Sequence, residues 1–172
     1  MPRFLYLLRH AQSAEKQMGQ SDRLRGLTSQ GIRQGLLIGN FLQNKRTSLD
    51  LIMSSIATRA FETANMIVDS LKYDEESILL QEELYEASTR TFFQLVSQLE
   101  DNLHHVMCIG HNPTISYLAE YFTKREIGEM VPAGMAIIKF DINHWRDVNE
   151  GNGILEEYIT AEIVSHNYNK KK

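Results

Sequence analysis

The sequence predicts an α/β protein: a three-layer α/β/α sandwich with a mainly parallel central sheet and an antiparallel C-terminal strand. Short apolar runs alternate with amphipathic segments of helical period through most of the 172 residues, which is typical of a sheet covered by helices. The first run, Phe4–Leu8, is continuously apolar, as in a strand buried on both faces. Near the C-terminus two apolar runs flank the turn-like stretch 149–153, which favours an antiparallel pair.

Several expected helices begin at a local signal. The helix after the first loop starts at Thr28, a suitable N-cap, and Ser88 is a suitable N-cap for a later helix. Pro113 suits the first turn of the helix that follows the strand ending at Gly110. After the first strand, the expected elements are a helix at 28–43, a strand at 49–55, a helix at 55–71, a strand at 77–81, a helix at 88–99, a strand at 104–110, a helix at 113–122, and strands at 135–142 and 154–164.

Composition and charge restrict the class of protein. One domain over residues 1–172 is expected, with residues 165–172 as a frayed tail, because no repeat or flexible linker interrupts the pattern. The net charge of −4 excludes a nucleic-acid binder that relies on a basic face. No apolar stretch approaches about 18 residues, and Arg9 interrupts the first one, so neither a membrane span nor a signal peptide is expected. A single cysteine, Cys108, forms no internal disulfide, and a cytoplasmic location is expected.

Two of the expected strands end in a histidine. The first ends at Arg9 and His10, and the strand at 104–110 is followed by His111. Ligands of open α/β sheets bind beyond the carboxyl ends of the strands, so both histidines are expected at one edge if their strands are neighbours. Arg59 lies in the first turns of the helix that follows a third strand. Each of these residues alone would be ordinary, but two histidines and two arginines at one edge indicate a site.

This combination suits a tetrahedral dianion such as a phosphoryl group. Guanidinium groups present paired donors that match phosphate oxygens. Neighbouring arginines lower the pKa of an imidazole, and the neutral ring keeps a nitrogen free to attack phosphorus. The second histidine, as imidazolium, donates to an oxygen on which charge develops.

Four ordered motifs resemble the histidine phosphatase superfamily, also called phosphoglycerate mutase-like. "LLRHAQS" resembles its RHG-type signature, and "LTSQGIRQG" resembles its L-T-x-x-G-x-x-Q segment. "SSIATRAFETA" matches its S-x-x-x-R-x-x-x-T-A segment, and "GHNP" matches its second-histidine motif. The resemblance extends through "PAGMAIIKFD" to about Asp141. It implies a phosphoglycerate mutase-like fold and a phosphatase that needs no cofactor and no metal.

The resemblance also implies a role for each matching residue. His10 matches the nucleophile that takes the phosphoryl group, Arg9 and Arg59 match phosphate-binding arginines, and His111 matches the second pocket histidine. The sequence departs from the family at Ala11, where glycine is usual. The carbonyl of that residue is still expected to orient the His10 ring.

The short chain resembles the SixA-type protein phosphohistidine phosphatases within this superfamily. The stretch from "LIMSS" to "ELYEAS" is short, so little sequence remains to build a lid over a small substrate. Asp22 and Arg25 match an acidic and a basic position in the loop before the first helix, although Gly26 replaces a proline there. These two residues are expected to form a substrate loop, or else a plain surface ion pair. The implied partners are a phosphorylated protein and a phosphate or other oxyanion.

The role of Glu86 depends on the class of substrate. "LYE" falls where phosphomonoesterase relatives place the acid that protonates a leaving alkoxide, whereas a loop glutamate is more often simply solvated. A phosphohistidine leaving group takes a proton on its other ring nitrogen and does not need this acid. The preferred function is dephosphorylation of phosphohistidine on a protein such as a signalling relay domain. The alternatives are a phosphatase of small phosphomonoesters and a non-catalytic phosphate- or phosphoprotein-binding module.

Overall fold

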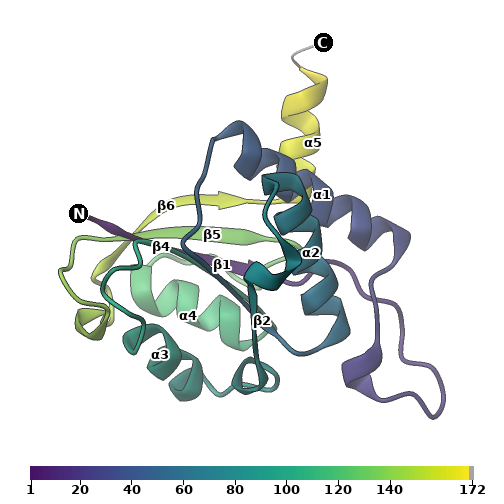
Figure 1. Ribbon diagram of the computed structural model, residues 1–172, viewed down its shortest axis with the longest axis horizontal. Helices are drawn as coiled ribbons and strands as arrows, with labels where there is room; N and C mark the ends of the chain where they lie inside the picture. The colour runs from purple at the N-terminus through teal and green to yellow at the C-terminus, as the bar shows by residue number, and fades with distance from the viewer. Residues whose placement is uncertain (171–172) are drawn as a thin grey trace.

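The computed structural model describes residues 1–170 and contains a six-stranded sheet between two layers of helices (Figure 1). The strands are β1 (Arg3–Arg9), β2 (Leu51–Ser55), β3 (Ile78–Gln81), β4 (His105–Gly110), β5 (Met135–Phe140) and β6 (Gly153–Ile159). The helices are α1 (Ser29–Asn44), α2 (Thr58–Leu71), α3 (Thr89–Ser97), α4 (Thr114–Thr123) and α5 (Ala161–Asn169). Short 3-10 turns include η1 (Asp22–Leu24), η2 (Glu75–Ser77) and η3 (Glu82–Leu84).

The sheet has the order β3-β2-β4-β1-β5-β6. Strands β3, β2, β4 and β1 pair in parallel, whereas β5 runs antiparallel to both β1 and β6. The prediction of a mainly parallel sheet whose last strand pairs antiparallel with its predecessor is therefore confirmed. The carboxyl ends of β2, β4 and β1 lie at one edge of the sheet, as parallel pairing requires.

Helices cover both faces of the sheet. Figure 1 shows α1, α2 and α5 on one face and α3 and α4 on the other. Strand β1 is buried between them: Leu5 and Leu7 pack into the core under α3 and α4, and Tyr6 and Leu8 pack into the core under α1 and α2. This arrangement explains why Phe4–Leu8 is apolar without alternation.

The expected N-caps are present. The Thr28 side chain accepts a hydrogen bond from Gly31 N at the start of α1, and the Ser88 side chain accepts one from Thr91 N at the start of α3. Pro113 occupies the position just before α4, one residue earlier than the first turn where it was expected. No helix within residues 1–170 is long and apolar enough to span a membrane.

The C-terminal expectation is wrong in two respects. The last strand ends at Ile159 instead of residue 164, because the Thr160 side chain accepts from Ile163 N and starts α5. The tail expected from residue 165 is helical up to Asn169, where Tyr168 is hydrogen-bonded to Asn44 of α1. The part of that expected tail at 171–172 lies outside the described residues.

Candidate active site

The ends of β1 and β4 bring the two histidines together. These strands are neighbours in parallel register, with Arg9 opposite Gly110, so the residues that follow them emerge side by side. The ring centroids of His10 and His111 are 5.1 Å apart. The structure thus places the two histidines at one edge, although a hundred residues separate them in the sequence.

The His10 ring is held in one tautomer. Its Nδ1 lies 2.8 Å from Ala11 O, and since a carbonyl oxygen only accepts, Nδ1 carries the proton. The pKa of His10 is lowered from 6.5 to about 4, mainly by burial and also by the charges of Arg59 and Arg9, against the hydrogen bond to Ala11 O, which raises it. The ring is 9% exposed and neutral at neutral pH, so the lone pair of Nε2 is free.

Thr63 of α2 fixes the loop that orients this ring. Its fully buried Oγ1 accepts from Ala11 N at 3.0 Å and donates to Arg59 O at 2.7 Å. The loop after β1 is thereby tied to the helix that carries Arg59. Thr63 is part of the matched motif, but its contact with Ala11 was not expected from the sequence.

His111 is neutral in this structure, contrary to the imidazolium expected from the sequence. Burial is the main cause that lowers the pKa of His111 to about 3, and the nearby His10 and Arg59 contribute to this lowering. Its Nε2 lies 2.8 Å from Ser55 Oγ at the end of β2. Because Ser55 Oγ accepts from Ala57 N, its own proton is free to be donated to Nε2, which leaves Nδ1 of His111 as a donor.

The two arginines of the site are held by different loops. Arg9 Nη1 donates to Met130 O at 2.6 Å and lies 3.9 Å from Glu129 Oε1 in the loop before β5. Arg59, 6% exposed, donates from Nη1 to Asp22 O at 2.9 Å and from Nη2 to Asp22 Oδ2 at 3.0 Å. The backbone carbonyl and the carboxylate of Asp22 therefore occupy the outer donors of Arg59.

Asp22 is the centre of a network that the sequence did not predict. It accepts from Arg25 Nε at 2.9 Å, from Arg59 and from the Tyr85 hydroxyl at 3.0 Å. These hydrogen bonds together lower the pKa of Asp22 to about 2 against the opposing effect of burial. The Asp22–Arg25 pair is thus part of the site wall and more than a plain surface ion pair.

Tyr85 is the functional candidate that sequence reasoning missed. Its ring meets the His111 ring edge-on, with 5.8 Å between centroids, while its hydroxyl contacts Asp22. The available signal was its position beside Glu86, directly after the short turn η3.

Glu86 lies at the margin of the site. It is exposed, has a positive φ of 55°, and lines a cavity of about 210 Å³ together with His111 and Pro113. The structure therefore brings Glu86 near His111.

The site retains unsatisfied buried donors. Among residues 1–170, six buried side-chain N or O atoms lack a hydrogen-bond partner, and three of them belong to this site: Arg9 Nε, Arg59 Nε and His111 Nδ1. Such groups are costly and are concentrated at functional sites. Two uncompensated arginine edges and a histidine nitrogen indicate a site built for an anion.

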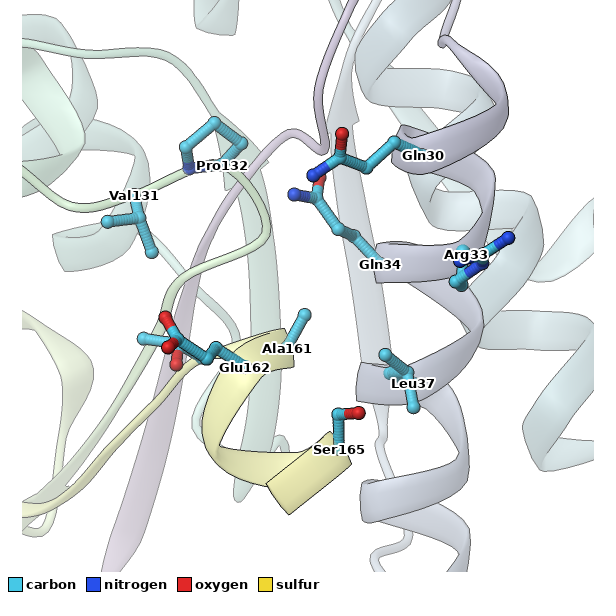
Figure 2. A pocket seen from close by; sticks show the side chains of 10 residues that line it. Gln30, Arg33, Gln34, Leu37, Val131, Pro132, Ala161, Glu162 and Ser165 are labelled. Carbon is cyan, nitrogen blue, oxygen red and sulfur yellow. The ribbon is translucent and has the colours of Figure 1, made fainter. Parts of the chain in front are cut away.

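Cavities that are larger lie elsewhere. Figure 2 shows one of about 520 Å³ between α1, α5 and the Val131–Pro132 segment, with Gln30 and Gln34 reaching toward that segment. Gln34 Oε1 also accepts from Gln12 N, so this cavity adjoins the loop after β1. None of the catalytic candidates lines it.

No group of three His, Cys, Asp or Glu side chains within residues 1–170 is arranged to hold a metal ion. The charged groups that act on the pKa of His10 are arginines, which donate hydrogen bonds and do not act as metal ligands.

Comparisons with known proteins identify the family. Residues 5–95 match the model of the histidine phosphatase superfamily (branch 1). An uncharacterized protein of Mycobacterium tuberculosis is 31% identical over 156 residues, which cover 84% of this chain and 93% of the relative. The mitochondrial serine/threonine-protein phosphatase Pgam5 of Drosophila ananassae is 24% identical over 189 residues, which cover 91% of this chain and 62% of that protein.

Solved structures agree with this assignment. A SixA protein from Agrobacterium tumefaciens, classed as a phosphohistidine phosphatase, superposes with a TM-score of 0.80 at 25% identity, covering 93% of this chain and 99% of that one. The protein histidine phosphatase SixA complexed with tungstate superposes with a TM-score of 0.79 at 22% identity, covering 95% and 99%. The chain therefore belongs to the histidine phosphatase superfamily, in its SixA-like branch, and this membership supports phosphatase activity.

Proposed function

We propose that the protein removes the phosphoryl group from phosphohistidine on another protein, through a covalent phosphohistidine on His10. The state of His10 carries this proposal. Its ring is buried and neutral, its Nδ1 is bonded to Ala11 O, and its Nε2 lone pair is free beside His111. A neutral imidazole nitrogen held in one orientation is a suitable nucleophile for phosphorus.

In the first step, His10 Nε2 forms a bond to phosphorus while the bond from phosphorus to the substrate's ring nitrogen breaks. With its other nitrogen protonated, the substrate ring leaves as neutral imidazole. Arg9, Arg59 and His111 would stabilise the three phosphoryl oxygens, because their donors face developing negative charge. In the second step, water attacks phosphorus, phosphate leaves, and Nε2 recovers its lone pair.

Asp22 takes part in substrate entry in this proposal. Its backbone carbonyl and its carboxylate accept from the two outer nitrogens of Arg59, Nη1 and Nη2, so an incoming phosphoryl group competes with Asp22 for them. Arg25 and Tyr85 retain Asp22 at the wall of the site when Arg59 turns to the substrate.

The neighbouring structures and the leaving group support phosphohistidine as the substrate. The SixA proteins superpose over almost their whole length, and one of them binds tungstate, a tetrahedral oxyanion. Glu86, the candidate acid, is exposed and touches none of the phosphate-binding side chains by a hydrogen bond. An imidazole leaving group does not need such an acid, and an alkoxide does.

A phosphatase of phosphoesters is the second candidate. Glu86 lines the small cavity beside His111, where an acid would reach a leaving oxygen, and Pgam5 is named for action on phosphoserine and phosphothreonine proteins. A Glu86→Gln variant separates the two candidate functions. If Glu86 protonates a leaving alkoxide, the variant hydrolyses phosphoesters more slowly. If phosphohistidine is the substrate, the variant hydrolyses the P–N bond at the wild-type rate.

The substrate test compares three kinds of phosphate donor in the presence of EDTA. These are a relay domain phosphorylated on histidine, a panel of small phosphomonoesters, and phosphoramidate as the smallest P–N compound, each with wild type and His10→Asn. The proposal expects release from the P–N donors, lost in the variant. Turnover of esters alone would favour the second candidate, and turnover of none would favour a phosphate-binding module.

A further inference from the structure

The outermost strand β3 leaves one lateral edge of the sheet open, which is distinct from the carboxyl ends of the strands where the candidate active site lies. It pairs with β2 on one side, and within residues 1–170 no strand pairs with its other side. Two of its four residues carry large exposed apolar side chains: Leu79 is 44% exposed and Leu80 is 48% exposed. Native proteins usually protect an edge by keeping the edge strand very short or by placing charged side chains on it; β3 is short, but two of its four side chains are exposed leucines.

Acidic residues flank this edge on both sides. Over residues 74–86 the sequence carries six acidic residues and no basic one. Five of these six, all except Glu86, directly flank β3. All five are exposed, and none of them makes an ion pair within the described part of the chain. The acidic flanks are Asp74, Glu75, Glu76, Glu82 and Glu83. Two copies of this edge would repel each other, whereas a basic segment would be attracted.

The same edge leads into the candidate active site. Gln81, the last residue of β3, is in register with Ser55, and Ser55 Oγ lies 2.8 Å from His111 Nε2. Four residues further along, Tyr85 contacts both Asp22 and the His111 ring. Since adjacent strands are about 4.8 Å apart, a strand added to β3 would end about 10 Å from Ser55.

We propose that the β3 edge binds an extended, basic segment of the substrate protein, next to its phosphohistidine. Main-chain hydrogen bonds to the open edge would provide affinity, Leu79 and Leu80 would contact apolar side chains of the segment, and the acidic flanks would select lysine and arginine. The inference rests on the proposed function, because it names the protein segment that this active site accepts.

The test uses two synthetic peptides with a central phosphohistidine. Both have the same apolar residues, and the flanking charges are lysine and arginine in one and glutamate in the other. The full chain is assayed with each peptide and with phosphoramidate, which is too small to reach the edge. Two double variants alter the edge: Glu75→Lys with Glu76→Lys, and Leu79→Thr with Leu80→Thr. The matched controls are Glu156→Lys and Ile154→Thr on β6, the opposite edge strand, where both side chains are exposed.

The expected result is a preference for the basic peptide, seen as a lower KM. Each edge variant reduces this preference at least about fivefold, because several exposed contacts are lost together. The β6 controls keep the preference, and phosphoramidate turnover is equal in all five proteins.

Three results would overturn the inference. No preference in the wild type, or a preference that the edge variants keep, would remove the docking role and leave the proposed function intact. A concentration-dependent dimer in sedimentation, broken by Leu79→Thr with Leu80→Thr, would assign the edge to a second copy of the chain. Failure to hydrolyse both peptides and phosphoramidate would instead reject the proposed function itself.

Discussion

The pKa of His10 makes a prediction for stability at acid pH. The folded state keeps His10 neutral down to about pH 4, whereas the unfolded chain binds a proton near 6.5. The unfolded state therefore binds more protons between these values, so stability is lost as the pH falls through this window. Wild type should lose about 2 kcal/mol more than His10→Asn between pH 7.5 and 5.0, measured by urea unfolding. Equal losses in the two proteins would contradict the burial of a neutral ring.

Asp22 carries a second prediction at the scale of the residue. Its carboxylate competes with an oxyanion for Arg59, and Asn keeps an oxygen acceptor without the charge. Asp22→Asn should bind tungstate or phosphate about two- to fivefold more tightly, a modest gain because the Asp22 side chain is partly exposed. Competitive inhibition constants measure this effect. Weaker binding in the variant would show that Asp22 mainly holds Arg59 in position.

Individual residues of the site were predictable only where a motif carried them. His10 and His111 each follow an apolar run, and that local pattern is visible in the sequence. The Asp22–Tyr85 contact joins loops 63 residues apart, and no local pattern encodes such a hydrogen bond. The prediction that His111 is an imidazolium was wrong for a related reason. The pKa of His111 is lowered mainly by burial, and burial depends on tertiary packing.

At the scale of the element, Thr63 links helix α2 to the loop after β1 that carries His10 and Ala11. Thr63 and Arg59 lie one turn apart on α2, and the Thr63 hydroxyl bonds both Arg59 O and Ala11 N. Thr63→Val leaves the buried Ala11 N–H without a partner, which should destabilise the fold by about 1–3 kcal/mol and lower turnover by misaligning His10. Thr63→Ser keeps the hydroxyl and is the control. Denaturant unfolding and turnover of phosphoramidate are the two measurements, and wild-type behaviour of Thr63→Val would contradict this role.

The ends of β6 and α5 show where sequence patterns are insufficient. The run at 154–164 alternates enough to suggest one strand, yet Thr160 interrupts it as an N-cap. Thr28 and Ser88, which were expected as caps, follow loops, whereas Thr160 follows a strand directly. Thr160→Ala should lower the free energy of unfolding by about 1 kcal/mol, since Ile163 N loses its acceptor. No change in urea midpoint would contradict this assignment.

At the scale of the whole molecule, strand order decides whether a site exists. The sequence predicts α/β alternation, but periodicity alone does not say that β4 lies between β2 and β1. That order places Ser55, His111 and His10 on three consecutive strand ends. The sequence pattern left open whether the strands before His10 and His111 are neighbours, and the family resemblance implied the fold without stating the strand order.

For the whole molecule we also expect activity that does not depend on a metal ion. The candidate site contains two arginines and two neutral histidines, and in the proposed mechanism the positive charge of Arg9 and Arg59 would take the role of a cation in binding phosphoryl oxygens. Turnover of phosphoramidate should be unchanged after dialysis against EDTA. Loss of activity that is restored by a divalent cation would contradict this expectation.

The covalent step on His10 is the central claim, and trapping the phosphoenzyme tests it most directly. Wild type is mixed with a phosphohistidine protein, quenched at alkaline pH within one turnover, and digested for mass spectrometry. We predict a phosphoryl group on His10 in the wild type and none in His10→Asn, which releases no phosphate. Phosphate release by His10→Asn at the wild-type rate, or a phosphoryl group on another residue, would contradict the mechanism.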